Sequence, residues 1–252
     1  MTLVEDSQPP QRRRQRPPVA DDPTLAPQLR LAVLPYLVHI AAGAALVGLM
    51  VALGDEPPDG MEFYSPAYGL VIVGSYVALG LATIWVAQKT GQPERVLGLV
   101  RTRLWRAVGL TVAAFVASVA IAYPLEQIFH GAESQGFEPN AYPGGAEAAI
   151  GLALIIFGIC LFGPLCEELY FRGILYGALR RFGPLLATLG SSLLFAVVHF
   201  TPAAIPVLMV IGIALALLYE LTGSLWPPIA FHVLNNSLAM IGALGSDGTG
   251  GN

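Results

Sequence analysis

Long apolar runs separated by short polar segments dominate this chain. Five of them have about the 17 to 25 residues that an α-helix needs to cross a bilayer. Two further runs are irregular, because 148–179 is too long for one crossing and 185–200 is slightly short. The pattern predicts an all-α, polytopic membrane helical bundle with seven transmembrane helices, or eight if 148–179 crosses twice. The five regular runs are 31–53, 67–87, 107–125, 203–219 and 225–244.

The composition agrees with a protein that lies in lipid. Of the 252 residues, 55% are hydrophobic and 12% are charged, which is about half the charged fraction of an average soluble domain. We therefore expect an integral membrane protein of the plasma (inner) membrane, with the lipid bilayer as its surroundings. The net charge of −4 argues against a nucleic-acid partner.

Basic residues predict the orientation of the chain. Lys and Arg accumulate in cytoplasmic loops of membrane proteins. They are frequent in the Arg- and Pro-rich segment 1–29 and between the second and third runs, and absent after the first and third runs. We expect 1–29 to be a disordered cytoplasmic tail, because it has too little apolar surface to fold alone. The run 31–53 is longer than the core of a signal peptide, so we expect it to remain as a helix.

The long run 148–179 is predicted to cross the membrane once. Arg180 and Arg181 follow it, and a single crossing leaves them on the cytoplasmic side with the other basic residues. Pro164 lacks the N–H that a regular helix requires, so it predicts a kink. The freed backbone could line a wet cavity, or the position could be an ordinary proline kink.

Three ionisable groups lie within six residues of this apolar run: Glu167, Glu168 and Arg172. Each ionised group near the middle of a membrane helix costs roughly 2.5 to 3.5 kcal/mol, so such a cluster indicates a functional site. Glu168 and Arg172 are spaced i, i+4 and can pair on one helix face, whereas Glu167 points about 100° away. Glu167 is then free to act as a general base. The alternative is a structural ion-pair cluster between helices.

Polar residues on two later helices complete the pattern. His199 follows Phe195 by four residues, and His232 and Asn236 are spaced i, i+4 on the last run. Paired donors of this kind can stabilise an oxyanion, although they can also be simple hydrogen bonds between helices. His39 is given only the latter interpretation. We predict that the three groups form one site, which requires the fourth helix to project from the membrane so that Glu167 and His232 lie at one level.

The ordered patterns Glu-Glu-x-x-x-Arg, Phe-x-x-x-His and His-x-x-x-Asn resemble those of the CPBP intramembrane proteases. This family comprises CAAX proteases and bacteriocin-processing (Abi) enzymes, and the chain is similar to its Ras-converting CAAX prenyl endopeptidase type. The resemblance covers 148–244. It implies a catalytic core at 148–245. The preceding segment 30–147 is recognisable only as N-terminal transmembrane helices, and we expect 246–252 to be a flexible C-terminus.

The resemblance also implies a role for each residue. Glu167 and His199 would activate a water molecule, His232 and Asn236 would stabilise the oxyanion, and Glu168 and Arg172 would shape the site. The family is also labelled metalloprotease, so a divalent metal such as zinc is possible. Its ligands would then come from the set Glu167, His199 and His232. The chain lacks the zinc-binding pattern His-Glu-x-x-His, and we favour glutamate chemistry without a cofactor.

These observations predict an intramembrane endopeptidase that hydrolyses a peptide bond in a membrane-associated protein or peptide. They do not specify whether the substrate is prenylated, or the oligomeric state. A thiol nucleophile is disfavoured, because neither Cys160 nor Cys166 has a recognisable base beside it. The alternative function is a non-catalytic membrane transporter or scaffold that uses the same polar cluster, since intramembrane carboxylates also mark proton pathways.

Overall fold

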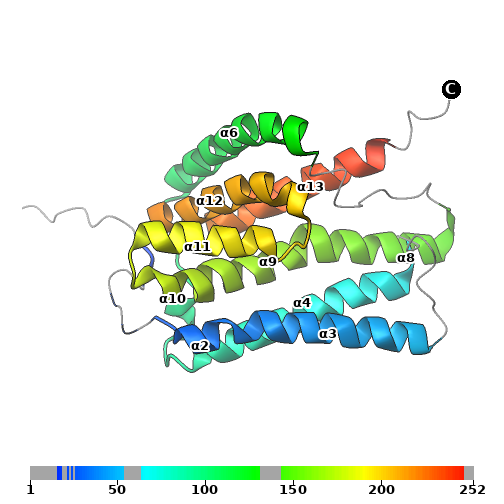
Figure 1. Ribbon diagram of the computed structural model, residues 1–252, viewed down its shortest axis with the longest axis horizontal. Helices are drawn as coiled ribbons and strands as arrows, with labels where there is room; N and C mark the ends of the chain where they lie inside the picture. Colours follow the sequence, from blue (N-terminus) through cyan, green and yellow to red (C-terminus); the bar gives the residue numbers. More distant parts are fainter. Residues whose placement is uncertain are drawn as a thin grey trace, which may run out of the picture.

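The computed structural model describes residues 16–18, 22, 24, 26–53, 64–130 and 143–246. Every regular element in these residues is helical, and the helices form an elongated bundle whose members run mostly along its long axis (Figure 1). The predicted all-α class is confirmed. Most of the expected tail 1–29 and nearly all of the expected flexible segment 246–252 lie outside the described residues.

The helices begin and end within a few residues of the predicted apolar runs, because each run stops where the sequence becomes polar. The N-terminal half contains α2 (Leu29–Ala32), α3 (Leu34–Ala52), α4 (Pro66–Gln88), α5 (Pro93–Val96) and α6 (Leu104–Phe129). The long fourth run contains α8 (Gly145–Ile156), η2 (Phe157–Phe162), α9 (Gly163–Glu168), η3 (Leu169–Leu175) and α10 (Tyr176–Arg180). The remainder contains α11 (Pro184–Val197), η4 (Pro202–Ala204), α12 (Ile205–Thr222) and α13 (Trp226–Ser246).

Five helical spans in the described residues are long and apolar enough to cross a membrane. The predicted number of seven to eight is therefore close but not met. The 14 residues of α11 are too few for a crossing, and α13 is not among the five although it has 21 residues. The five spans are Arg30–Ala52, Pro66–Gln88, Leu104–Phe129, Gly145–Arg180 and Pro202–Thr222.

The fourth run is one continuous helix of 36 residues, Gly145–Arg180, so the prediction of a single long helix holds. At about 1.5 Å per residue it is roughly 54 Å long, well beyond a hydrocarbon core of about 30 Å. Around Pro164, where the sequence predicts a kink, the helix continues and its backbone widens into the π-helical segments η2 and η3 on either side. The N–H of Gly163 accordingly donates to the carbonyl of Gly158, five residues back.

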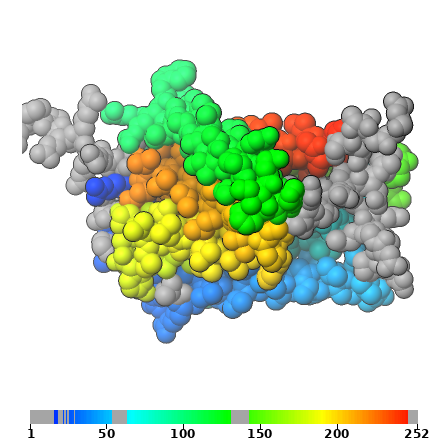
Figure 2. Space-filling model, turned by 45° about the horizontal axis from the view of Figure 1, so that its top comes forward, coloured from blue at the N-terminus to red at the C-terminus, as the bar shows by residue number. Residues whose placement is uncertain are grey.

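This long helix lies at the centre of the bundle. Every residue of 168–178 is buried, since α4 packs against one side and α11 and α13 pack against others. α12 contacts both α11 and α6, and α6 crosses the outside of the bundle over α12 (Figure 2). Polar groups at 167–172 are thereby enclosed by segments that are far apart in the sequence.

Close contact between α11 and α12 depends on Gly212. A Cβ at this position would lie 2.9 Å from the Cβ of Ser192, so even a methyl group forces the two helices apart. We expect Gly212→Ala to lower the free energy of unfolding in detergent micelles by about 1 to 3 kcal/mol. The matched control is Gly242→Ala on α13, where a Cβ would meet nothing within 4 Å. That variant should be neutral or slightly stabilised, and equal losses in both would contradict the packing argument.

Candidate active site

The glutamate pair and His232 lie together at the centre of the bundle. Glu167 and Glu168 are at the end of α9, and His232 reaches them from α13. The Nδ1 atom of His232 is 2.9 Å from Oε1 of Glu168, and its Nε2 atom is 3.7 Å from Oε2 of Glu167. Glu167 and His232 thus lie side by side although they are 65 residues apart in the sequence (232 − 167 = 65).

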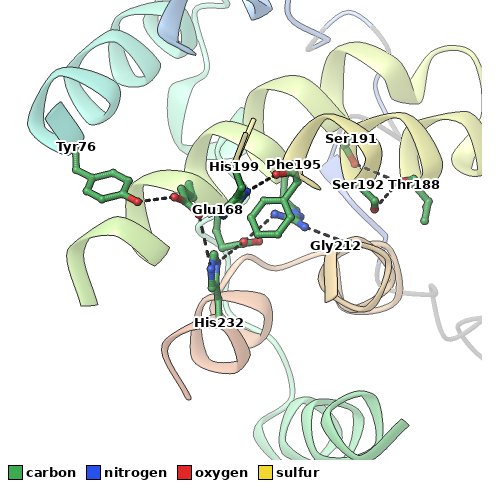
Figure 3. Close-up of polar contacts among 11 residues, drawn as sticks. Tyr76, Glu168, Thr188, Ser191, Ser192, Phe195, His199, Gly212 and His232 are labelled. Atoms are coloured by element: carbon green, nitrogen blue, oxygen red, sulfur yellow. Dashed lines mark hydrogen bonds and ion pairs between the residues drawn. The ribbon is translucent and has the colours of Figure 1, made fainter. Parts of the chain in front are cut away.

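Glu168 and Arg172 form a buried ion pair. Arg172 donates to Oε1 of Glu168 at 2.8 Å, and both side chains are 0% exposed. The guanidinium also donates to the carbonyl of Gly212 at 3.1 Å and lies 4.9 Å from the ring centre of Phe195. An ionised carboxylate can only accept, so Oε1 of Glu168, which pairs with Arg172, also accepts from Nδ1 of His232 (Figure 3). Nδ1 of His232 therefore carries a hydrogen.

Glu167 has a different environment from Glu168. Its side chain is 12% exposed, and its Oε1 atom accepts a hydrogen bond of 2.7 Å from the hydroxyl of Tyr76 on α4. Its Oε2 atom faces His232. Glu168 is thus fully buried in an ion pair, whereas the side chain of Glu167 is partly exposed.

His199 lies in an exposed turn just after α11, rather than within a helix that continues to residue 200. The helix ends at Val197, and Phe200 adopts a left-handed φ of 55°. Nδ1 of His199 donates to the carbonyl of Phe195 at 2.7 Å, since a carbonyl oxygen can only accept. Nε2 of the neutral ring is then the nitrogen with a free lone pair.

The ring of Phe195 lies against both histidines. Its centre is 4.9 Å from that of His199 and 5.6 Å from that of His232, both in edge-to-face geometry (Figure 3). Phe195 is fully packed, with 1% of its surface exposed. A rigid aromatic ring therefore sets the relative position of the two imidazoles, which are 33 residues apart in the sequence (232 − 199 = 33).

Asn236 is held by the backbone of the widened helix. Its amide donates to the carbonyl of Ile159 at 3.0 Å. That carbonyl cannot use the donors four and five residues on, because the N–H of Gly163 goes to Gly158 and Pro164 has no N–H. The Oδ1 atom of Asn236 accepts from Asn235 at 3.4 Å. One of the two amide hydrogens predicted for an oxyanion thus stabilises the π-helical turn.

The donor set for a metal ion is not assembled. Among the described residues, no group of three His, Cys, Asp or Glu side chains is placed to hold one metal ion. The trio Glu167, His199 and His232 suggested from the sequence therefore does not fit a three-ligand site. Cys160 and Cys166 are both buried and free, and Cys160 donates from its sulfur to the carbonyl of Asn236 at 3.7 Å.

Sequence reasoning missed Tyr76 and the carbonyls of Gly212 and Ile159. A tyrosine within the apolar run 67–87 carries a hydroxyl that needs a partner, but nothing in the run indicates that it faces Glu167. His39 was interpreted correctly, because its Nδ1 atom donates to the carbonyl of Ser75 on the neighbouring helix at 2.8 Å.

Comparisons with known proteins bear on this arrangement. The family model described as "Type II CAAX prenyl endopeptidase Rce1-like" matches residues 149–238, the segment that carries all six predicted site residues. The chain is 27% identical over 220 residues to the "Putative membrane peptidase YdiL" of Bacillus subtilis (strain 168), which covers 83% of this chain and 86% of the relative.

It is also 31% identical over 148 residues to the "Membrane-embedded CAAX protease MroQ" of Staphylococcus aureus (strain USA300), covering 54% of this chain and 56% of the relative. No solved structure matches the chain. The five apolar spans and these relatives identify an integral membrane protein. Its motifs, its family match over residues 149–238 and these relatives support a CPBP family protease of the membrane CAAX type.

Proposed function

We propose that this protein is an intramembrane endopeptidase in which Glu167 and His199 activate a water molecule for attack on a peptide bond. The observation that carries the proposal is the different environment of the two glutamates. Glu167 is partly exposed and lies 3.7 Å from His232, whereas Glu168 is 0% exposed and paired with Arg172. A general base must reach the proton that it removes, and Glu167 is the carboxylate with such access.

The proposed reaction uses the oxygen of Glu167 that Tyr76 leaves free. Oε2 takes one proton from water while the water oxygen bonds to the peptide carbonyl carbon, and the carbonyl oxygen becomes an oxyanion. His199 orients the water through its free Nε2 atom. As the oxyanion collapses, the C–N bond breaks and the departing nitrogen takes the proton from Glu167. One carboxyl and one amine product result, and Glu167 is ionised again.

His232 and Asn236 are proposed to stabilise the oxyanion. Nδ1 of His232 donates to Glu168, so a contact with the oxyanion would come from its Nε2 side, which also faces Glu167. Asn236 has two amide hydrogens, of which one is directed at Ile159. Removal of one donor of this kind from an acyl-transfer site slows turnover about 100- to 1,000-fold.

The proposed chemistry is independent of metal, because the donor set described above does not form a three-ligand site. Cleavage by the purified protein in detergent is therefore expected to persist after treatment with EDTA and 1,10-phenanthroline. Rates before chelation, after chelation and after zinc is added back would be measured on one peptide. Loss of cleavage on chelation together with recovery on zinc addition would overturn this part of the proposal.

The substrate is proposed to be a membrane-associated protein or peptide. The family description names a CAAX prenyl endopeptidase, and MroQ is named a CAAX protease. A peptide with a prenylated CAAX end is therefore the first class to test, with an unprenylated membrane peptide as the second. We further propose a location in the plasma (inner) membrane with a cytoplasmic N-terminus, which the distribution of basic residues supports.

Comparison of cleaved termini tests this function. Membranes from cells that produce the wild-type protein or Glu167→Gln would be analysed by mass spectrometry for new protein ends. Peptide bonds that are cut only in the presence of the wild-type protein support the proposal. A peptide that contains such a bond then serves as the substrate in the kinetic assays. Identical sets of termini in the two membranes would contradict it.

A further inference from the structure

Tyr76 contacts the proposed base from outside the segment that matches the family. It lies on α4, whereas the match begins at residue 149. Its hydroxyl donates to Oε1 of Glu167 at 2.7 Å (Figure 3). Its ring is seated against the backbone of Gly163, where a Cβ would lie 2.8 Å from two ring carbons. The position of the ring is therefore fixed one turn before Glu167 on the same helix.

Tyr36 makes a corresponding contact beside His199. It lies on α3, and its hydroxyl donates to the carbonyl of Val198 at 3.2 Å. Val198 directly precedes His199, so this bond ties the exposed turn to the N-terminal helices. The ring of Tyr36 stacks on Tyr170 with their centres 5.7 Å apart, and Tyr170 is buried in the central helix.

His39 connects the two tyrosines. Its ring centre is 5.4 Å from that of Tyr36 and 5.2 Å from that of Tyr76, and the latter pair is stacked with an interplanar angle of 29°. The bond from its Nδ1 atom to the carbonyl of Ser75 holds the ring in place. We call Tyr36, His39 and Tyr76 the aromatic column. One end of this column bonds the carboxylate of Glu167, and the other bonds the backbone next to His199.

We propose that the aromatic column is a positioning device by which the N-terminal helices α3 and α4 hold Glu167 and His199 at a fixed separation. This inference rests on the proposed function. Glu167 lies on α9 and His199 lies in the turn after α11. Misplacement of reacting groups by about 1 Å can slow catalysis about 100-fold. Tyr76 also occupies Oε1 of Glu167, which leaves Oε2 as the oxygen that takes the proton.

The test compares Tyr76→Phe with Tyr68→Phe. Both changes remove one hydroxyl from α4, but Tyr68 packs against a separate cluster that contains Tyr64, Ala148 and Met240. With the peptide identified above, we expect Tyr76→Phe to lower kcat about 10- to 100-fold, the effect of losing a hydrogen bond to a charged group. KM should stay within twofold of the wild-type value, because the hydroxyl positions the base and does not bind substrate. Tyr68→Phe should retain wild-type kinetics.

The outcomes separate this inference from the proposed function. Wild-type kcat in Tyr76→Phe, while Glu167→Gln is inactive, overturns the column and leaves the proposed function intact. A rise in KM at unchanged kcat also overturns it, because substrate binding would then be the affected step. Full activity in Glu167→Gln overturns the proposed function itself. If Tyr76→Phe does not fold, Tyr36→Phe decides: a reduced kcat at wild-type KM supports the column, and wild-type kinetics rule it out.

Discussion

Replacement of Glu167 by Gln is expected to lower kcat about 100- to 10,000-fold, which is the usual contribution of a general base. The amide has nearly the same size as the carboxylate, and its oxygen can still accept the hydrogen bond from Tyr76. It has no lone pair basic enough to remove a proton from water. The folded structure should therefore be retained, with a melting temperature in detergent close to the wild-type value.

The matched variant is Glu168→Gln, which makes the same replacement of a carboxylate oxygen by an amide nitrogen at the neighbouring residue. Glu168 is 0% exposed and bonds both Arg172 and His232, so its neutral form leaves a buried guanidinium without its counter-charge. We expect a clear drop in melting temperature for Glu168→Gln and almost none for Glu167→Gln. Peptide cleavage and thermal unfolding would be measured on the same preparations. Wild-type cleavage by Glu167→Gln, or equal destabilisation of the two variants, would contradict the assigned roles.

The positions of the helices along the chain were largely predictable from the sequence. Apolar runs end where charged and turn residues begin, so the observed Pro66–Gln88 and the predicted 67–87 differ by one residue at each end. The pairing of Glu168 with Arg172 followed from their i, i+4 spacing on one helix face. Local spacing and run length are properties of a single segment, and both can be read without knowledge of its neighbours.

The partners contributed by other helices were not predictable in the same way. In a soluble helix, an apolar stripe shows which face turns inward, but a membrane helix is apolar toward lipid as well as toward protein. The run 67–87 therefore gave no sign that Tyr76 faces Glu167. The π-helical turn at Phe157–Phe162 was equally hidden, because its carbonyl at Ile159 is satisfied by Asn236 from α13. Both contacts depend on how the helices are rotated against each other.

Replacement of Arg172 by Met is expected to lower the free energy of unfolding by about 3 to 5 kcal/mol, because it leaves one charge of a buried pair without its partner. Among the described residues, Glu168 would keep only His232 as a partner for Oε1, and its Oε2 atom already has no hydrogen-bond partner there. The carbonyl of Gly212 would also lose its donor. Methionine fills much of the space of the arginine stem, so the loss comes mainly from charge and hydrogen bonding.

The control is Arg180→Met on the same helix. Arg180 pairs with Glu220 at a similar distance of 2.8 Å, but the two side chains are 15% and 17% exposed, and water can solvate the charge that remains. We expect a loss of roughly 1 kcal/mol there, measured by circular dichroism during unfolding in mixed micelles. Combining Arg172→Met with Glu168→Gln should recover part of the larger loss, because both charges are then removed. Equal losses of stability in Arg172→Met and Arg180→Met would contradict this argument. The buried ion pair would then contribute no more than an exposed one, and it could not be what holds Glu168 beside Glu167.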